Sequence, residues 1–322
     1  MKISVLGCGR WGSFIAWYLC TRRGYEVTSW GPEDDYSYQI LNMTGKNEYV
    51  SLDPRIRLTS DLEEAVTSAE VIVISISSQG LRGFASRIRA FDTKDKKFVL
   101  CMKGIEVSTG KRLSEVMEEC GFDPMQIAVW VGPGHIQAFT QGIPNCMVID
   151  SKNEELKRFL ADNFKSDLIR FYYGTDLIGT EIGAAAKNVM GIAAGALDGA
   201  GLSSLKGPLM ARGAREVARL IVAMGGSELS AYGLAHLGDY ETTLFSEYSH
   251  NRAYGESLVK GQKFAKLAEG VTTADAMRRM GERYNVDLPI TNAVYESCYG
   301  GDEVDCLKVI LRLFSRDSKS EF

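Results

Sequence analysis

Short apolar runs alternate with amphipathic segments along the first half of the chain. Residues 70–76 are the clearest example, because they are almost continuously apolar, as in a strand buried on both faces of a parallel sheet. Similar runs predict further strands over residues 2–6, 26–30, 97–102, 126–131, 145–149 and 168–172. Helical spacing predicts helices over residues 13–20, 61–66 and 154–164, and another that starts with a serine cap at Ser77. This alternation indicates a doubly wound α/β sheet.

The pattern changes near residue 180, where strand-like runs disappear and apolar residues recur at helical spacing. We expect helices over residues 181–199, 209–224, 272–284 and 303–314. The third of these helices is predicted to begin at Thr272 and Thr273. Residues 315–322 are expected to fray. The 322 residues therefore divide into two predicted domains, an α/β sheet domain over 1–179 and an all-helical domain over 180–322.

A glycine-rich hexapeptide, GCGRWG, occupies residues 7–12, between the first predicted strand and the first predicted helix. In this pattern Gly7 permits a tight turn, Gly9 lets the backbone approach a pyrophosphate, and Gly12 lets helix and strand pack closely. The N-terminus of the following helix then faces the anion. The flanking strand and helix favour a dinucleotide site over an ordinary glycine-rich turn. We therefore expect the domain over residues 1–179 to be Rossmann-like and to bind a dinucleotide.

The residue that separates NAD from NADP is expected at the end of the second strand. An acid there bonds the ribose hydroxyl of NAD, and an arginine meets the extra phosphate of NADP. Glu33 and Asp34 suit NAD and no arginine lies near them, but Pro32 alters the path of the loop. The predicted cofactor is therefore NAD or NADP, with a weak preference for NAD.

The helix predicted over residues 181–199 contains a single cation, Lys187, in an otherwise small and apolar stretch before Asp198. On a helical period Lys187 shares a face with small residues that leave space around its ammonium group, namely Gly183, Ala184, Gly191 and Ala194. Burying an unpartnered ammonium group is costly, so such a lysine normally has a charged partner, a ligand or a lowered pKa. Most helical lysines are instead solvated, but the small neighbours favour a functional role here.

Lys103 is a second candidate, because it directly follows the strand predicted over residues 97–102. Ligands of open α/β sheets bind at the carboxyl edge of the strands, so this lysine is a candidate contact for an anion or a substrate. Taken alone, the position fits a solvated loop lysine equally well.

Composition narrows the class of protein. The net charge of −4 and the isoelectric point near 5.6 argue against a general nucleic-acid binder but leave local sites for small anions. Seven cysteines without a CxxC spacing favour a reducing compartment and predict neither a disulfide framework nor a metal site. No apolar run reaches the ~18 residues of a membrane span. The first strand begins at Lys2, so we expect no signal peptide and a cytoplasmic protein, and the helical half permits a homodimer.

Several motifs together resemble those of the NAD(P)-dependent glycerol-3-phosphate dehydrogenases, over nearly the whole chain. EIGAAAKN at residues 181–188 and KGIE at residues 103–106 are the specific parts, since many dehydrogenases share the glycine motif. Further matching stretches lie at residues 7–12, 78–82, 132–133, 238–239, 251–252, 269–273 and 288–291. The resemblance implies hydride transfer between a nicotinamide cofactor and a small phosphorylated substrate pair, sn-glycerol 3-phosphate and dihydroxyacetone phosphate. This reaction feeds glycerophospholipid synthesis.

The resemblance also implies roles for individual residues. Lys187 matches the general acid/base, Lys103 matches a lysine that contacts substrate near the cofactor, and Asp239 matches the acid beside these lysines. Cofactor contacts are implied for Gly7, Gly9, Arg10, Trp11, Gly12, Lys103 and Glu269. Substrate contacts are implied for Lys103, Gly132, Lys187, Asp239, Ser249, His250, Asn251 and Arg252. The domain over residues 180–322 is accordingly predicted to bind substrate.

The implied role of Lys187 agrees with the chemistry that it must perform. Oxidation of a secondary alcohol requires removal of the hydroxyl proton as hydride leaves the carbon. A free lysine, with a pKa of ~10.4, is almost wholly protonated at neutral pH. Burial and a second cation lower such a pKa toward ~7–8, the range in which a general base works, and a nearby acid orients the ammonium group. In the reducing direction the same ammonium group donates its proton to the nascent alkoxide.

The sequence departs from the family in the segment implied to bind the substrate phosphate. His250 stands where the family usually has arginine, and an imidazole cannot form the same bidentate pair with a phosphate. Either His250 binds the phosphate together with Arg252 and Lys206, with weaker or pH-dependent affinity, or the pocket takes a related hydroxy-acid or polyol substrate. We prefer the first account because the catalytic residues are retained. A further alternative, a non-catalytic sensor of NAD(P)H, has no need of a proton-transfer lysine.

Overall fold

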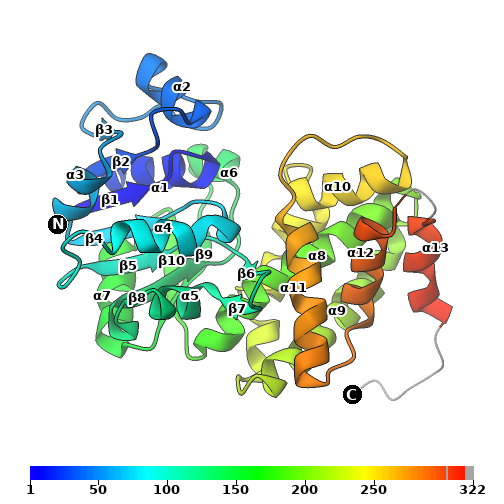
Figure 1. The fold of residues 1–322 in the computed structure, drawn as a ribbon. Coiled ribbons are helices and arrows are strands. Elements are labelled where there is room, and N and C mark those ends of the chain that lie inside the picture. The colour runs from blue at the N-terminus through cyan, green and yellow to red at the C-terminus, as the bar shows by residue number, and fades with distance from the viewer. Residues whose placement is uncertain (302–303, 316–322) are drawn as a thin grey trace. The chain divides into compact units, whose positions relative to one another are not determined.

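The computed structural model describes residues 1–301 and 304–315 and divides the chain into two compact units. Unit 1 comprises residues 1–103 and 111–177, and unit 2 comprises residues 104–110 and the chain from residue 178 onward. Unit 1 is built around a sheet covered by helices, and unit 2 is largely helical, which confirms the predicted fold class (Figure 1). The sequence contained no sign that residues 104–110 belong with the second unit.

The centre of unit 1 is an eight-stranded sheet. Its strands are β1 (Lys2–Leu6), β2 (Glu26–Trp30), β3 (Arg57–Thr59), β4 (Val71–Ile74), β5 (Lys97–Leu100), β8 (Ile127–Val131), β9 (Asn145–Ser151) and β10 (Ile169–Tyr173). They lie in the order β10-β9-β8-β5-β4-β1-β2-β3, and all neighbours are parallel except β8 and β9. The two-residue strands β6 (Ile105–Glu106) and β7 (Lys111–Arg112) follow β5 in the chain. The sequence did not predict the short strand β3.

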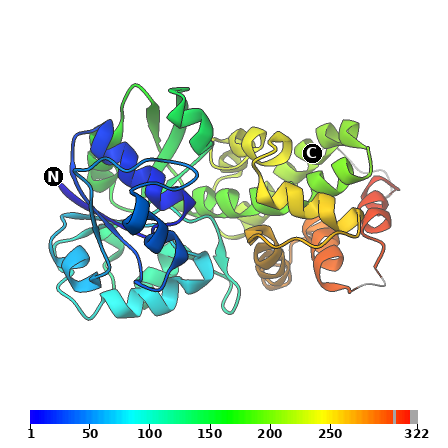
Figure 2. The same cartoon turned by 90° about the horizontal axis from the view of Figure 1, so that it is seen from above.

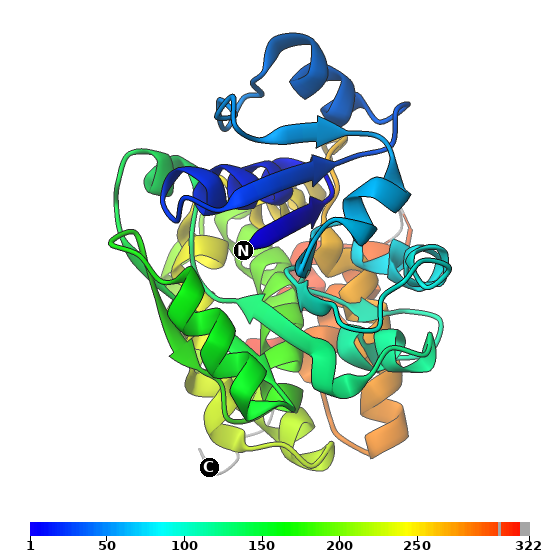
Figure 3. The same cartoon turned by 90° about the vertical axis from the view of Figure 1, so that its left-hand side faces the viewer.

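Helices cover both faces of this sheet, which explains why inner strands such as β4 and β8 are apolar throughout. The helices are α1 (Arg10–Thr21), α2 (Tyr36–Thr44), α3 (Leu62–Thr67), α4 (Leu81–Ile88), α5 (Leu113–Glu119), α6 (Ile136–Thr140) and α7 (Glu154–Phe164), with short 3-10 turns η1 (Ser78–Gly80) and η2 (Pro124–Gln126). Val5 of β1 belongs to the core with α1 and α7, whereas the adjacent Leu6 belongs to the core with α3 and α4. Figure 2 shows α1 and α4 on opposite sides of the strands, and Figure 3 shows α7 opposite α4.

Three helix starts in unit 1 differ from the prediction, that of α3 by one residue, because Asp61 is its N-cap. α1 begins at Arg10 rather than at residue 13, directly after Gly9, so the last three residues of the glycine-rich hexapeptide form its first turn. The predicted serine cap is wrong, because Ser77 makes no side-chain capping hydrogen bond and precedes the 3-10 turn η1. The α-helix itself begins only at Leu81.

Unit 2 is assembled around α8 (Leu177–Gly199), which is buried along almost its whole length (Figure 1). The other α-helices are α9 (Lys206–Ala223), α10 (His250–Val259), α11 (Glu269–Tyr284), α12 (Pro289–Tyr299) and α13 (Cys306–Leu311). Short turns lie between them, the 3-10 helices η3 (Ser203–Leu205), η4 (Glu228–Tyr232), η5 (Leu237–Asp239) and η7 (Arg312–Ser315) and the π-helix η6 (Glu241–Phe245). Within residues 1–301 and 304–315, no helix is long and apolar enough to cross a bilayer.

The boundaries of the last helices also differ from the prediction. α11 begins at Glu269, so the predicted start at Thr272 and Thr273 is wrong. Both threonine hydroxyls donate back to the Glu269 carbonyl, at 3.0 and 2.8 Å, and so do not cap the amides of a new helix. The helix predicted over residues 303–314 corresponds to α13 and η7, but residue 303 lies outside the described residues, as do residues 316–322 of the predicted frayed tail.

Small residues let α8 and α10 approach each other closely. A Cβ atom at Gly195 would lie 1.9 Å from the carbonyl oxygen of Arg252. A Cβ atom at Gly255 would lie 2.0 Å from the carbonyl oxygen of Ile192. Only glycine fits at either position, so these two helices cross with their backbones in contact.

Glu216 on α9 holds the beginning of α12. Its buried carboxylate accepts hydrogen bonds from the Ile290 and Thr291 amides, at 2.7 and 2.9 Å, and from the Thr291 hydroxyl at 2.7 Å. α12 has proline in its first turn and no N-cap side-chain hydrogen bond of its own. An acid from another helix therefore satisfies its first amides.

We expect Glu216→Ala to lower the free energy of unfolding by about 3 kcal/mol, because it leaves buried amides without an acceptor. Urea denaturation measures this loss. Glu228→Ala is a matched control, since the Glu228 side chain is 57% exposed and pairs with Arg215 at 3.4 Å. It is expected to change stability by less than about 0.5 kcal/mol. Equal losses in both variants would contradict the capping role.

Candidate functional site

The glycine-rich turn lies where the strand order of the sheet reverses. β1 lies between β2 and β4, and ligands of such sheets bind beyond the carboxyl ends of the strands at this point. Gly7 has a φ of 123°, and a Cβ atom there would lie 2.1 Å from the Ser75 carbonyl oxygen. A Cβ atom at Gly12 would lie 1.9 Å from the Gly7 carbonyl oxygen. Packing of the chain against itself therefore requires glycine at both positions.

Gly9 differs from the other two glycines of the motif. A Cβ atom at Gly9 would meet nothing within 4 Å, so the space beside the turn is open. Gly9 is also the N-cap of α1, which has no side-chain cap and no acidic residue in its first turn. The amides of such a helix start attract an anion. The open space and the uncapped helix together fit the pyrophosphate of a dinucleotide.

The residues next to Gly9 also lie at the start of α1. Arg10 and Trp11 are half-buried, and the Arg10 guanidinium lies 5.4 Å from the centre of the Tyr49 ring. Glu33 and Asp34, the two acids considered for the ribose of NAD, are exposed in the loop that follows β2. These side chains can therefore be reached by a ligand without unfolding of unit 1.

Lys103 and Gly132, both predicted to contact substrate, lie together in unit 1. The half-buried Lys103 ammonium donates a hydrogen bond of 2.8 Å to the Gly132 carbonyl oxygen. Lys103 follows β5, and Gly132 follows β8, with a φ of 127°. Since β5 and β8 are parallel neighbours, the two residues share the carboxyl edge of the sheet where ligands bind.

Lys187 has the charged partner that the sequence predicted for a buried cation. Its ammonium lies 2.8 Å from Oδ2 of Asp239 and donates to the Thr243 hydroxyl at 2.8 Å. Lys187 is 8% exposed and Asp239 is fully buried, so solvent screens their attraction little. Thr242 donates to Oδ1 of Asp239, and Thr243 donates to the Asp239 carbonyl oxygen at 2.8 Å. The charges are therefore held in one orientation by side chains from α8, η5 and η6.

The small residues of α8 have a different effect from the one expected. The sequence suggested that they leave open space around the Lys187 ammonium. A Cβ atom at Gly191 would instead lie 2.9 Å from Cγ2 of Thr243, and one at Gly183 would lie 2.9 Å from Cβ of His236. The space is filled by the segment that brings Asp239 to the lysine. Sequence reasoning missed Thr243, because it lies in a π-helix, a feature found often at functional sites that leaves no periodic pattern in the sequence.

Asn251 links three parts of unit 2. Its side-chain amide donates to Oδ1 of Asn188 at 3.0 Å, and its Oδ1 accepts from the Gly270 amide at 2.9 Å. Asn188 follows Lys187 on α8, and Gly270 follows Glu269 at the start of α11. The predicted substrate residue Asn251 and the predicted cofactor residue Glu269 are thereby joined to the lysine helix.

Ser249 and His250 lie at the start of α10. Ser249 is the N-cap and accepts a hydrogen bond of 3.3 Å from the Arg252 amide. His250 is half-buried, and its Nδ1 lies 3.3 Å from the Leu267 carbonyl oxygen. Because a carbonyl can only accept, this contact orients the ring with Nδ1 as the donor.

Arg252 and Lys206 share one carboxylate. Oδ2 of Asp198 lies 2.7 Å from the Arg252 guanidinium and 2.6 Å from the Lys206 ammonium. These cations lower the pKa of Asp198 against the opposing effect of burial, which is the largest single influence. A second acid, Glu256, lies 3.5 Å from the same Arg252 guanidinium and also pairs with Lys260, so this cluster contains three cations and two carboxylates.

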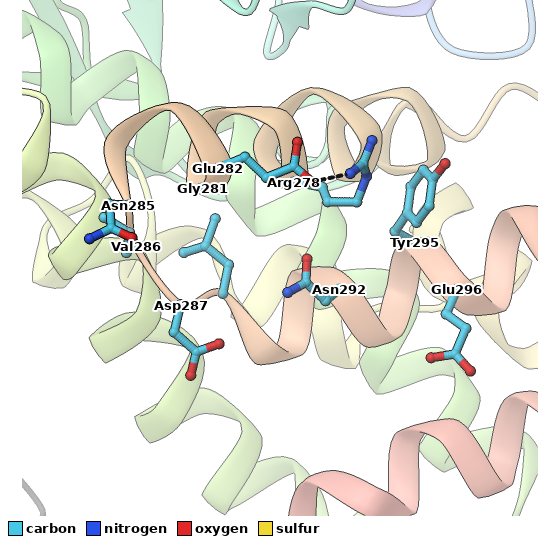
Figure 4. A pocket seen from close by; sticks show the side chains of 10 residues that line it. Arg278, Gly281, Glu282, Asn285, Val286, Asp287, Asn292, Tyr295 and Glu296 are labelled. Atoms are coloured by element: carbon cyan, nitrogen blue, oxygen red, sulfur yellow. Dashed lines mark hydrogen bonds and ion pairs between the residues drawn. The ribbon is translucent and has the colours of Figure 1, made fainter.

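A separate pocket of about 580 Å³ lies between α11 and α12 (Figure 4). Arg278 forms an ion pair with Glu282 at its edge and stacks over the Tyr295 ring at 4.6 Å. None of the residues predicted to bind cofactor or substrate lines this pocket. This pocket is therefore not part of the candidate cofactor and substrate sites.

The chain resembles known proteins along nearly its whole length. The N-terminal model of NAD-dependent glycerol-3-phosphate dehydrogenase matches residues 2–157, and the C-terminal model matches residues 176–308. Glycerol-3-phosphate dehydrogenase (NAD(P)+) of Chlorobium phaeobacteroides is 35% identical, with 100% of this chain and 99% of the relative covered. The protein of the same name from Moorella thermoacetica is 36% identical, with 96% and 95% covered.

Solved structures show the same relation. The crystal structure of glycerol-3-phosphate dehydrogenase from Coxiella burnetii aligns with a TM-score of 0.89 and 25% identity, covering 98% of this chain and 99% of that one. A D-mandelate dehydrogenase with NADH aligns with a TM-score of 0.63, 16% identity and 93% and 98% coverage, which shows a likeness of fold alone. The full-length identity with the named relatives shows that the chain belongs to the NAD-dependent glycerol-3-phosphate dehydrogenase family.

Proposed function

We propose that this chain interconverts sn-glycerol 3-phosphate and dihydroxyacetone phosphate with NAD(P)(H), a reaction that feeds glycerophospholipid synthesis. The main support for this proposal is the buried ion pair of Lys187 and Asp239, whose charged atoms lie 2.8 Å apart. A dehydrogenase of secondary alcohols needs a proton-transfer group in a fixed position, and this pair provides one. The names of the similar proteins support the choice of substrate pair. Loss of nicotinamide absorbance on addition of dihydroxyacetone phosphate, with NADH and NADPH in separate assays, tests it. Oxidation of neither would favour a related hydroxy-acid or polyol substrate, or a sensor.

Lys187 is the proposed general acid and base. In the reducing direction its ammonium donates a proton to the alkoxide that forms at the substrate carbonyl. In the oxidising direction its neutral amine takes the hydroxyl proton. Asp239 and Thr243 orient the amine, since both lie 2.8 Å from Nζ. Because both side chains are shielded from water, the contacts of the Lys187 ammonium with Asp239 and Thr243 are stronger than they would be at the surface.

The glycine turn is the proposed pyrophosphate site, and Arg10, Trp11, Lys103 and Glu269 are proposed to contact the cofactor. When bound, the nicotinamide cofactor supplies or accepts the hydride. The support for this assignment is the uncapped start of α1 beside the open space at Gly9.

The segment from Ser249 to Arg252 is proposed to bind the substrate phosphate. Arg252 and Lys206, the pair of cations on Asp198, supply positive charge, His250 supplies an imidazole, and Asn251 supplies an amide. Lys103 and Gly132 are also proposed to contact substrate. A cytoplasmic location, a homodimer, the absence of nucleic-acid binding, and the domain roles assigned to residues 1–179 and 180–322 stay predictions from the sequence.

Gly9→Ala tests the pyrophosphate site. The added methyl meets no protein atom within 4 Å, so we expect unchanged stability and NAD(P)H affinity weakened at least about 10-fold by contact with the pyrophosphate. Gly83→Ala is a matched control, because a Cβ at Gly83 also meets nothing within 4 Å. Calorimetric titration measures both affinities. Wild-type affinity in Gly9→Ala would contradict the assignment.

Lys187→Ala tests the proton-transfer role. We expect turnover to fall about 10²–10⁴-fold, because the acid and base are lost, while NAD(P)H binding is retained. Stopped-flow or steady-state absorbance gives the turnover, and fluorescence titration gives the binding. Lys260→Ala on α10, whose side chain is 43% exposed, is the control and should behave as wild type. Near-normal turnover in Lys187→Ala would reject the role.

Substitutions of His250 test the phosphate segment. We expect His250→Ala to raise the KM for dihydroxyacetone phosphate about 10-fold, and His250→Arg to lower it, because a guanidinium forms a bidentate pair with phosphate. The KM for NAD(P)H should not change and serves as the internal control. An unchanged KM for dihydroxyacetone phosphate in His250→Ala would argue for a related hydroxy-acid or polyol substrate.

A further inference from the structure

A buried pair of side chains, His236 and Tyr240, has no part in the proposed mechanism but brackets Asp239 in the chain. Both are fully buried. Nδ1 of His236 lies 2.8 Å from the Gly183 carbonyl oxygen, and Nε2 lies 2.7 Å from the Tyr240 hydroxyl. The two rings pack edge to face, with centroids 4.7 Å apart.

The direction of both hydrogen bonds follows from the groups involved. Burial lowers the pKa of His236 to about 4, so the ring is neutral at pH 7, although the Gly183 carbonyl and Asp239 act in the opposite sense. Since the Gly183 carbonyl can only accept, Nδ1 carries the proton and Nε2 holds a lone pair. The Tyr240 hydroxyl therefore donates to Nε2. The chain of bonds runs from Tyr240 through His236 to Gly183 without an unsatisfied atom in the ring.

The bonds connect the two elements that carry the ion pair. Gly183 lies one helical turn before Lys187 on α8, and in an α-helix its carbonyl also accepts the Lys187 backbone amide. On the other side, the Asp239 amide donates to the His236 carbonyl oxygen at 3.0 Å. His236 thus joins the turn that carries Lys187 to the turn that carries Asp239.

The surrounding sequence makes room for this pair. A Cβ atom at Gly183 would lie 2.9 Å from Cβ of His236, and one at Gly213 would lie 3.0 Å from the Tyr240 hydroxyl. Asp239 ends a 3-10 turn and precedes a π-helix, so short turns rather than a continuous α-helix hold its backbone. Side-chain links therefore add to the few backbone hydrogen bonds that fix its position.

We propose that His236 and Tyr240 are positioning residues, which hold Asp239, and through it the Lys187 ammonium, in the geometry for proton transfer. This inference rests on the proposed function, because it assigns the purpose of the pair to the proposed acid and base. A pair that only filled the core would affect stability without affecting proton transfer.

Tyr240→Phe tests the proposal, because it keeps the buried ring and removes only the hydroxyl. We expect kcat to fall about 10-fold while the KM for dihydroxyacetone phosphate stays within about 2-fold. A loss in kcat without a matching change in KM is the result expected of a residue that positions the proton-transfer group, and packing alone would not produce it.

Tyr18→Phe is the matched control. Tyr18 is likewise fully buried, and its hydroxyl donates to the Phe164 carbonyl oxygen at 2.6 Å within unit 1. A comparable loss of Tm is expected in both variants, with a wild-type kcat in Tyr18→Phe only. A wild-type kcat in Tyr240→Phe would overturn the proposal.

A measurement without turnover separates this inference from the proposed function. Thermal unfolding of Tyr240→Phe, Asp239→Asn and the double variant should show a Tm loss in the double variant smaller than the sum of the two single losses. Additive losses would overturn the link between Tyr240 and Asp239, whichever substrate the chain uses. Coupled losses in a chain inactive toward dihydroxyacetone phosphate would reject the proposed function and leave the link supported.

Discussion

The buried ion pair between Lys187 and Asp239 is the interaction on which the arrangement of unit 2 depends. A charge in the interior is costly without its partner, and breaking a buried pair costs ~3–5 kcal/mol. The lysine projects from a long helix and the acid lies on a short turn, so the two backbones must approach closely. Gly183 and Gly191 on α8 permit that approach, since a Cβ at either would lie 2.9 Å from a neighbouring side chain. The small residues of α8 are therefore a condition of the ion pair.

Carboxylates that are buried or half-buried join separate elements of unit 2. Asp198 of α8 binds Lys206 of α9 and Arg252 of α10, and Glu216 of α9 binds the first amides of α12. Helices satisfy their own backbone groups internally, so side chains must supply the specific links between them. In unit 1 the backbone itself supplies these links, through the parallel ladders of the sheet. The two units thus place their functional groups by different means.

This difference explains which parts of the candidate site the sequence could predict. The glycine turn was recognisable because its geometry is local: Gly7, Gly9 and Gly12 lie within six residues, between a strand and a helix. Lys187 was recognisable as a buried cation because its neighbours on one helix are small. Its partner Thr243 was not, because it lies 56 residues away in the chain, in a π-helix that has no periodic signature. Asp239 was named only through the family resemblance.

The order and type of most elements follow from the spacing of apolar residues, because this spacing is a local property that selects strand or helix. It therefore predicted the doubly wound sheet, the helical second half and the fully buried strand β4. Contacts made after folding set the antiparallel pairing of β9 with β8, the membership of residues 104–110 in unit 2, and the bonds of His236 and Tyr240 around Asp239. These features depend on which surfaces meet after folding, and no local pattern specifies the partner of a buried polar group.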